Sequence, residues 1–114
     1  MRIVHKESGK VLAENAQVAE SFFERLKGLM FIREMKGLDA LLIRNTNSVH
    51  NCFVRFSLDL IFVNNEMQVI KIIRGFKPWR FTRIYFKARH VLELPAGAIG
   101  KEVKEGDQLE ALGV

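Results

Sequence analysis

Short runs of hydrophobic residues, separated by polar turns, follow one another along most of the chain, which is typical of β-strands. Two such runs lie on either side of residues 7–10 in the segment RIVHKESGKVLAE. Gly9 can supply the positive φ that a tight turn between antiparallel strands requires. The pattern therefore predicts a hairpin at the start of the sequence.

A second hairpin is predicted in the middle of the chain. The runs SLDLIFVN and QVIKIIRG are rich in β-branched residues and flank the polar residues 64–67. Three single strands are predicted elsewhere, in LDALLIRN, in ARHVLELPAGAIG as far as Pro95, and in EGDQLEAL.

Helical spacing of apolar residues occurs in the segment SFFERLKGLM. Ser21 precedes Glu24 by three residues, which matches a capping box, and Gly28 can end a helix in a left-handed conformation. We therefore predict one short helix near residues 21–28.

Many short strands and one short helix favour a mostly β fold, that is, a β-rich α+β protein. A βαβ arrangement is disfavoured because it needs long crossover helices. We expect a single small barrel or a jelly-roll-like sandwich. The chain has 114 residues, close to the commonest domain size, so residues 1–114 are predicted to form one domain.

The composition of the chain bears on its expected location in the cell. The chain has one cysteine, and MRIVHKESGK lacks the apolar core of a signal peptide. Apolar runs are shorter than the ~18 residues that a membrane-spanning helix needs. These observations predict a cytoplasmic protein with no membrane partner.

Charge is distributed unevenly along the chain. The formal net charge is +5, yet residues 67–92 contain no Asp or Glu. Cations in this tract alternate with Phe, Trp and Tyr residues, a mixture that can hold phosphates and stack on the bases of single-stranded nucleic acid. The alternative is a solvated cationic face whose aromatic side chains point inward. The cations are Lys71, Arg74, Lys77, Arg80, Arg83, Lys87 and Arg89.

Ionisable residues also interrupt HNCFVRFSLDLIF, residues 50–62, which otherwise has the pattern of a buried strand. Side chains alternate along a strand, and both faces become apolar from Leu60 onward. Asp59 should therefore lie at the entrance to a strand covered on both sides, where a buried carboxylate needs hydrogen bonds or a cation.

Four segments resemble a known family in their order and spacing: ERLKGLM, VHNCFVRFSLDLIFVN, KPWR and ARHVLELPAG. They are similar to the domain-of-unknown-function family 192. The resemblance implies a β-rich barrel or jelly-roll-like domain with one short helix, and no established activity, substrate or cofactor. Some members are exported or anchored in membranes, whereas this chain resembles the soluble form.

The same resemblance suggests which residues form a site. Arg55 and Asp59 match the family pattern of the central strand, while Asn51 stands where the family tends to have Thr and Val54 where it tends to have Met. The tentative ligand-binding set is Arg55, Asp59, Lys77, Trp79, Arg80 and Glu93, with His50 and Asn51 in a second tier.

Three functions remain open at this stage. The favoured hypothesis is a binding module for nucleic acid or an anionic small molecule. The second is a small enzyme that uses Asp59 and Glu93 as acid and base, with the catalytic residues otherwise unknown. The third is a protein–protein adaptor in which the charged cluster is a structural brace. No cofactor is expected, and no metal, because His5, His50 and His90 are scattered and follow no metal-ligand spacing.

Overall fold

The computed structural model describes residues 1–19, 40–50 and 56–113, and it is mostly β in these residues. The helix predicted near residues 21–28 lies outside them. The strands are β1 (Arg2–His5), β2 (Val11–Ala13), β3 (Ala16–Ala19), β4 (Ala40–Arg44), β5 (Leu58–Val63), β6 (Val69–Phe76), β7 (His90–Pro95) and β8 (Leu109–Leu112).

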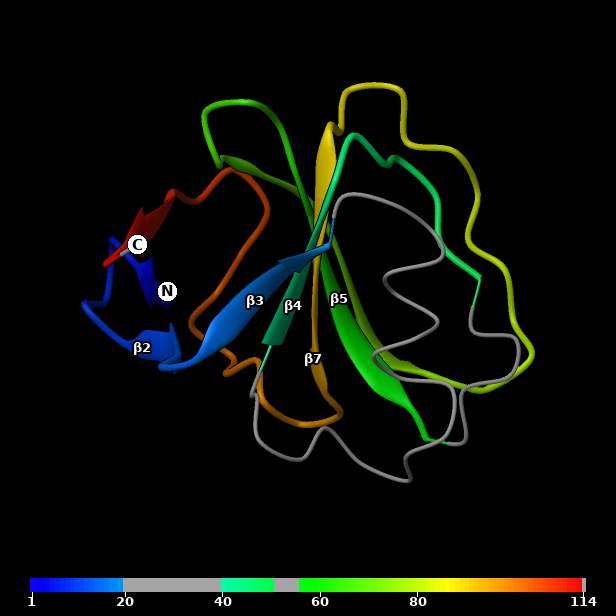
Figure 1. Cartoon of the computed structure of the whole chain (residues 1–114), viewed down its shortest axis with the longest axis horizontal. Helices are drawn as coiled ribbons and strands as arrows, with labels where there is room; N and C mark the ends of the chain where they lie inside the picture. Colours follow the sequence, from blue (N-terminus) through cyan, green and yellow to red (C-terminus); the bar gives the residue numbers. More distant parts are fainter. Residues whose placement is uncertain (20–39, 51–55, 114) are drawn as a thin grey trace.

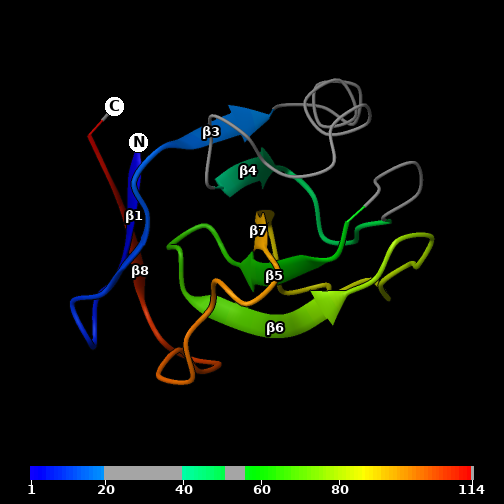
Figure 2. The ribbon, with the colours of Figure 1, turned by 90° about the horizontal axis from the view of Figure 1, so that it is seen from below.

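These strands form two sheets (Figures 1 and 2). The smaller has the order β2-β1-β8 and the larger the order β3-β4-β7-β5-β6. The pairings are antiparallel except for β3 with β4, which is parallel. A barrel would need its edge strands to pair, but β3 and β6 lie at opposite edges of the larger sheet. The mostly β prediction is confirmed, whereas the described strands do not close into a barrel.

Both predicted hairpins are present. β1 pairs with β2 across a turn in which Gly9 has a φ of 75°. β5 pairs with β6 across residues 64–67. The three predicted single strands correspond to β4, β7 and β8.

Two features of the strands differ from the sequence pattern. β3 was not predicted, because AQVA is short and half alanine, and it is ordered by parallel pairing with β4. Within the described residues, the strand predicted over residues 50–62 runs from Leu58 to Val63, and His50 makes an isolated bridge with Phe81. Residues 51–55 lie outside the described residues.

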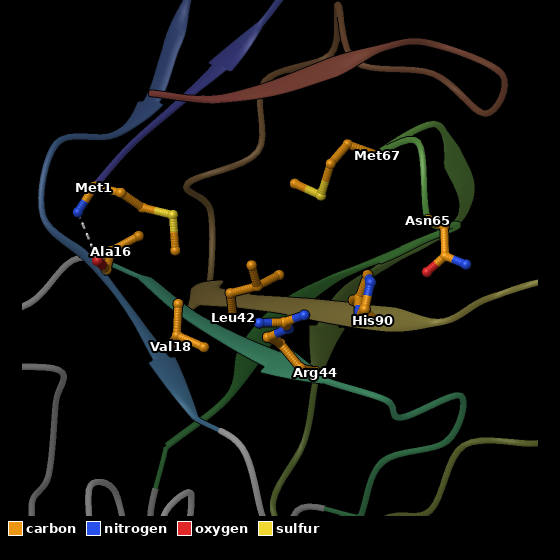
Figure 3. Close-up of a pocket in the computed structure, with 8 residues that line it drawn as sticks. All are labelled: Met1, Ala16, Val18, Leu42, Arg44, Asn65, Met67 and His90. Carbon is orange, nitrogen blue, oxygen red and sulfur yellow. Dashed lines mark hydrogen bonds between the residues drawn. The ribbon is translucent and has the colours of Figure 1, made fainter. Parts of the chain in front are cut away.

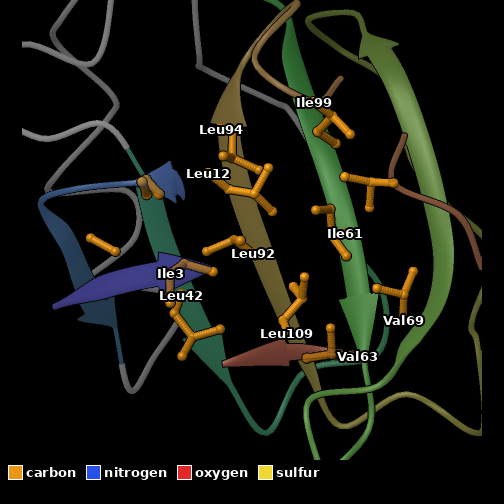
Figure 4. Close-up of a cluster of buried hydrophobic side chains, with 14 residues drawn as sticks. Ile3, Leu12, Leu42, Ile61, Val63, Val69, Leu92, Leu94, Ile99 and Leu109 are labelled. Atoms are coloured by element: carbon orange, nitrogen blue, oxygen red, sulfur yellow. The ribbon is translucent and has the colours of Figure 1, made fainter. Parts of the chain in front are cut away.

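The larger sheet has an apolar cluster on each face. On one face, Leu42, Ile61 and Leu92 pack with Ile3 and Leu109 of the smaller sheet (Figure 4). On the other face, Leu60, Phe62 and Val91 pack in a second cluster that includes Tyr85. Burying each such side chain stabilises the fold by about 1.5–3 kcal/mol. Every residue of β5 is buried, as its apolar pattern predicts.

Candidate functional site

Asp59 is held by backbone amides. Its side chain is in β5 and is 1% exposed. The Gly75 N–H donates to Oδ1 at 2.9 Å, while the Gly97 and Ile99 N–H groups donate to Oδ2 at 2.9 and 3.2 Å. Gly75 reaches this position at an irregularity in β6 with a φ of 68°. In the described residues, this carboxylate therefore fastens β6 and the turn after β7 to β5.

Glu93 lies on the other face of the same sheet. In the β5–β7 pairing, Leu94 is opposite Asp59 and Leu60 is opposite Glu93. Leu94 belongs to the cluster beneath the smaller sheet, whereas Leu60 belongs to the second cluster. Directly paired residues share a face, so the two carboxylates point to opposite sides. The β5–β7 register therefore places Asp59 and Glu93 on opposite faces of the sheet, although an acid–base mechanism would need both carboxylates in one site.

The remaining candidates occupy the surface or lie outside the described residues. Lys77, Trp79 and Arg80 are exposed in the segment that follows β6. His50 is half-buried, and its ring centroid lies 6.0 Å from that of Phe81. Arg55 and Asn51 are among the residues that the structure does not describe.

The segment of residues 77–89, here called the basic-aromatic loop, is fixed along its length. It runs from β6 at the sheet edge to β7, on the right of Figure 1. Backbone hydrogen bonds join Thr82 N–H to Val49 O at 2.8 Å and Tyr85 N–H to Asn47 O at 2.9 Å. Arg89 N–H donates to Val63 O at 2.7 Å. The loop is therefore anchored to the neighbouring 46–50 segment and to the end of β5.

Among the aromatic residues of the loop, Tyr85 packs inward and is partly buried, whereas the others are exposed. The Tyr85 ring packs on Phe62 with centroids 4.7 Å apart. Six large hydrophobic side chains are exposed in the described residues, and four belong to this loop. These four are Trp79 at 60%, Phe81 at 75%, Ile84 at 52% and Phe86 at 85% exposed. The sequence left open whether the aromatic side chains of this tract point inward. Tyr85 does so, whereas Phe81 and Phe86 are exposed.

Cations alternate with these exposed apolar residues along the loop. Five basic residues of the loop are exposed, and the loop has no acidic residue. Four large apolar side chains exposed within one short segment can mark a binding site when they form one surface patch. The cations are Lys77, Arg80, Arg83, Lys87 and Arg89.

A separate polar cluster, here called the His5 cluster, joins the first hairpin to the turn before β8. His5 is 1% exposed. Its Nδ1 lies 2.6 Å from Ser8 Oγ, and its Nε2 lies 2.7 Å from Asp107 Oδ2 and 3.5 Å from Glu7 Oε1. The Gln108 N–H donates to the Glu7 carboxylate. The sequence does not reveal this cluster, because Asp107 is 102 residues from His5.

The His5 cluster has clear electrostatic consequences. The hydrogen bond with His5, and then the Lys104 N–H, holds the pKa of Asp107 below its ordinary value of 3.8. Ligand atoms of His5, Glu7 and Asp107 all lie within 4.8 Å of one another, so in the described part of the chain these residues could hold a metal ion. The His5–Asp107 hydrogen bond and the Gln108 N–H that donates to Glu7 already account for their positions.

Comparison with known proteins gives relatives along almost the whole chain. Residues 3–111 match the model of DUF192, described as "Uncharacterized ACR, COG1430". A UPF0127 protein of Pyrococcus furiosus is 35% identical over 106 residues, covering 90% of each chain. A UPF0127 protein of Thermococcus sibiricus is 29% identical over 113 residues, covering 95% of this chain and 73% of its own.

Solved structures share the fold. A Sinorhizobium meliloti protein, provisionally named a transcription regulator, has a TM-score of 0.74 and 25% identity over 96% of this chain and 89% of its own. A Novosphingobium aromaticivorans protein of unknown function has a TM-score of 0.71 and 21% identity over 97% of this chain and 93% of its own. Within the described residues, no helix is long and apolar enough to cross a membrane. The family match over residues 3–111 shows that the chain belongs to the DUF192 family.

Proposed function

We propose that this protein binds single-stranded nucleic acid through the basic-aromatic loop. The observation that carries the proposal is the exposure of Trp79, Phe81 and Phe86 in a segment that also presents five cations and no acid. Lys and Arg neutralise phosphates, and exposed aromatic faces stack on unpaired bases for about 1–3 kcal/mol per base.

The anchoring of the loop supports this function. Its backbone hydrogen bonds to the 46–50 segment, the packing of the partly buried Tyr85 and the burial of Ala88 reduce the conformational entropy that binding would otherwise cost. Trp79 has a φ of 62°, a left-handed conformation that strains a bulky residue by roughly 1–3 kcal/mol. Such strain is commonly retained where it presents a side chain to a ligand.

A small recess lies at the foot of the loop and offers a place for a phosphate group. Its volume is about 120 Å³. Arg89 is one of its lining residues, and a guanidinium can hold a phosphate through two N–H donors. The recess is lined by Asn45, Thr46, Asn47, Ala88 and Arg89.

Two further points fit the proposal. The S. meliloti protein of similar fold is provisionally named a transcription regulator. The proposal also assumes the cytoplasm, where nucleic acid is present and a single cysteine stays reduced.

Fluorescence of Trp79, the sole tryptophan, provides the direct test. Single-stranded RNA and DNA oligonucleotides should change its emission in a saturable manner at low salt. The affinity should fall as salt increases, because binding releases counterions from the phosphates. An emission that stays constant through the titration would contradict the proposal.

Matched variants separate stacking from charge. Phe86→Ser should weaken oligonucleotide binding about tenfold, whereas Leu112→Ser, also at an exposed apolar residue, should not change it. Arg83→Gln should weaken binding and reduce its salt dependence, whereas Lys101→Gln should change neither as much.

Binding tests with polyphosphate and with anionic lipid vesicles distinguish nucleic acid from other anionic partners. If polyphosphate binds as tightly as an oligonucleotide of equal charge, the aromatic side chains do not contribute and the stacking model is wrong. If vesicles of anionic lipid bind through Phe86 while oligonucleotides do not bind, the loop is a membrane-surface contact and the proposal fails.

A further inference from the structure

A mostly apolar pocket, which shares no residue with the basic-aromatic loop, opens between the two sheets (Figure 3). Its volume is about 440 Å³, within the range of ~300–1,000 Å³ that small-molecule sites occupy. The lining residues are Met1, Ala16, Val18, Leu42, Arg44, Asn65, Met67 and His90.

The walls of the pocket come from the larger sheet, from its β5–β6 turn and from Met1, which precedes β1 of the smaller sheet. Val18 and Leu42 are paired neighbours in β3 and β4 and form part of its floor. The side chains of Met1 and Met67 extend toward the middle of the pocket from the opposite side in Figure 3. Met side chains adapt their shape to a ligand because they are unbranched and polarizable. This part of the pocket suits a flexible hydrocarbon chain.

The polar side chains of the lining gather at the other end of the pocket. Arg44 and His90 are directly paired across β4 and β7, so their side chains lie side by side on the same face as Leu42. The Asn45 N–H donates to His90 Nδ1 at 3.1 Å, so the neutral ring carries its proton on Nε2. Asn65 lies near the same end (Figure 3).

Charge at this end favours an anion. None of the described residues that line the pocket is acidic, and Arg44 carries a permanent positive charge. A guanidinium has five N–H donors arranged to fit a carboxylate, so it can accept a ligand while it keeps other contacts. A nucleotide would fit poorly, since the remaining walls offer few polar partners for its sugar and phosphates.

We infer that this pocket binds a monocarboxylate with an apolar tail, with the carboxylate at Arg44 and His90 and the tail against Leu42, Met1 and Met67. The ligand class follows from the cationic end formed by Arg44 and His90 and from the apolar side chains of the remaining walls, where the Met1 α-ammonium donates to the Ala16 carbonyl at 2.9 Å. This site is independent of the basic-aromatic loop, because the pocket and the loop have no residue in common.

Isothermal titration calorimetry with octanoate tests the inference, because octanoate remains monomeric at millimolar concentrations. One octanoate should bind per chain. Octan-1-ol should bind at least about tenfold more weakly, because it lacks the charge that pairs with Arg44, and octylammonium should not bind. Amide NMR shifts should change at Val18 and Leu42.

Two variants with matched controls locate the site. Arg44→Gln should weaken octanoate binding about tenfold or more and leave octan-1-ol binding unchanged, whereas Arg2→Gln, at an exposed arginine outside the pocket, should change neither. Val18→Trp should block binding by filling the pocket, whereas Gln17→Trp, on the opposite face of β3, should not.

Two results of these experiments would contradict the inference. The inference is wrong if octanoate produces no saturable signal with the wild-type protein, or if octanoate and octan-1-ol bind equally to wild type and Arg44→Gln. Thermal melting checks that each variant is folded, and octanoate binding by Gln17→Trp serves as the reference. Oligonucleotide binding measured through Trp79 should be the same in wild type and Arg44→Gln, so failure of one site is distinguishable from failure of the other.

Discussion

The chain buries a carboxylate in β5 and exposes a group of aromatic side chains in the basic-aromatic loop. Asp59 is 1% exposed and accepts three backbone hydrogen bonds. Phe81 and Phe86 are 75% and 85% exposed although they are among the most hydrophobic residues of the chain. Each region reverses the usual placement of polar and apolar groups.

The difference between the two regions lies in what their groups contact. The carboxylate is compensated within the protein, so its free energy of burial is offset by hydrogen bonds and the region is structural. The aromatic side chains of the loop remain exposed to water, so their burial by a binding partner would be favourable. Substitutions should therefore affect stability in β5 and binding in the loop.

The largest effect is expected for Asp59→Ala. The change leaves the N–H groups of Gly75, Gly97 and Ile99 without their acceptor, and Ile99 is buried. The free energy of unfolding should fall by about 3 kcal/mol or more in urea denaturation. Glu66→Ala removes an exposed carboxylate and should change it by less than about 0.5 kcal/mol. A loss below about 1 kcal/mol for Asp59→Ala would break the comparison, because the carboxylate would then be dispensable for the fold.

An intermediate effect is expected for His5→Leu. His5 is as deeply buried as Asp59, but its partners are accessible, since Ser8 is exposed and the Asp107 side chain is 20% exposed. Water can hydrogen-bond to the partners that His5 leaves behind, so the free energy of unfolding should fall by only roughly 1–2 kcal/mol. Lys6→Leu at the adjacent exposed position is the control in the same urea titrations. A loss equal to that of Asp59→Ala would show that the accessibility of the partners does not matter.

A smaller change of opposite sign in the free energy of unfolding is expected for a substitution in the basic-aromatic loop. Trp79→Gly removes a 60% exposed side chain and places glycine at a φ of 62°, which glycine adopts without strain. The free energy of unfolding should stay constant or rise by up to about 1 kcal/mol. Oligonucleotide affinity, measured by anisotropy of a labelled strand, should fall. A variant that loses stability and retains affinity would place Trp79 with the structural residues.

The smallest effect concerns acid stability. Because the pKa of Asp107 is lowered in the folded protein, its ionised form stabilises the fold above the ordinary pKa of 3.8. This contribution is lost as pH falls below that value through the folded pKa. Asp107→Asn should therefore flatten the pH dependence of stability in this acid range, and Glu66→Gln should not. Urea titrations between neutral pH and pH ~3 measure the difference. Equal slopes for wild type and Asp107→Asn would contradict the assignment.

Several parts of the candidate site could be predicted and others could not. The burial of Asp59 follows from the apolar residues around it, and the acid-free tract is visible in the sequence. The separation of Asp59 from Glu93 depends on the β5–β7 register, which the family motifs do not specify. The pairing of Arg44 with His90 is equally hidden, since 46 residues separate them along the chain and only the β4–β7 register joins them.

The sequence by itself determined the mostly β class, both hairpins, the burial of β5 and the composition of the basic-aromatic loop. These properties depend on local periodicity and turn chemistry, which neighbouring residues encode. Tertiary structure decided that backbone amides satisfy Asp59, that Phe81 and Phe86 face outward while Tyr85 packs on Phe62, and that a pocket opens between the sheets. These features depend on strand register and on packing between distant segments, and only the folded chain brings those segments together.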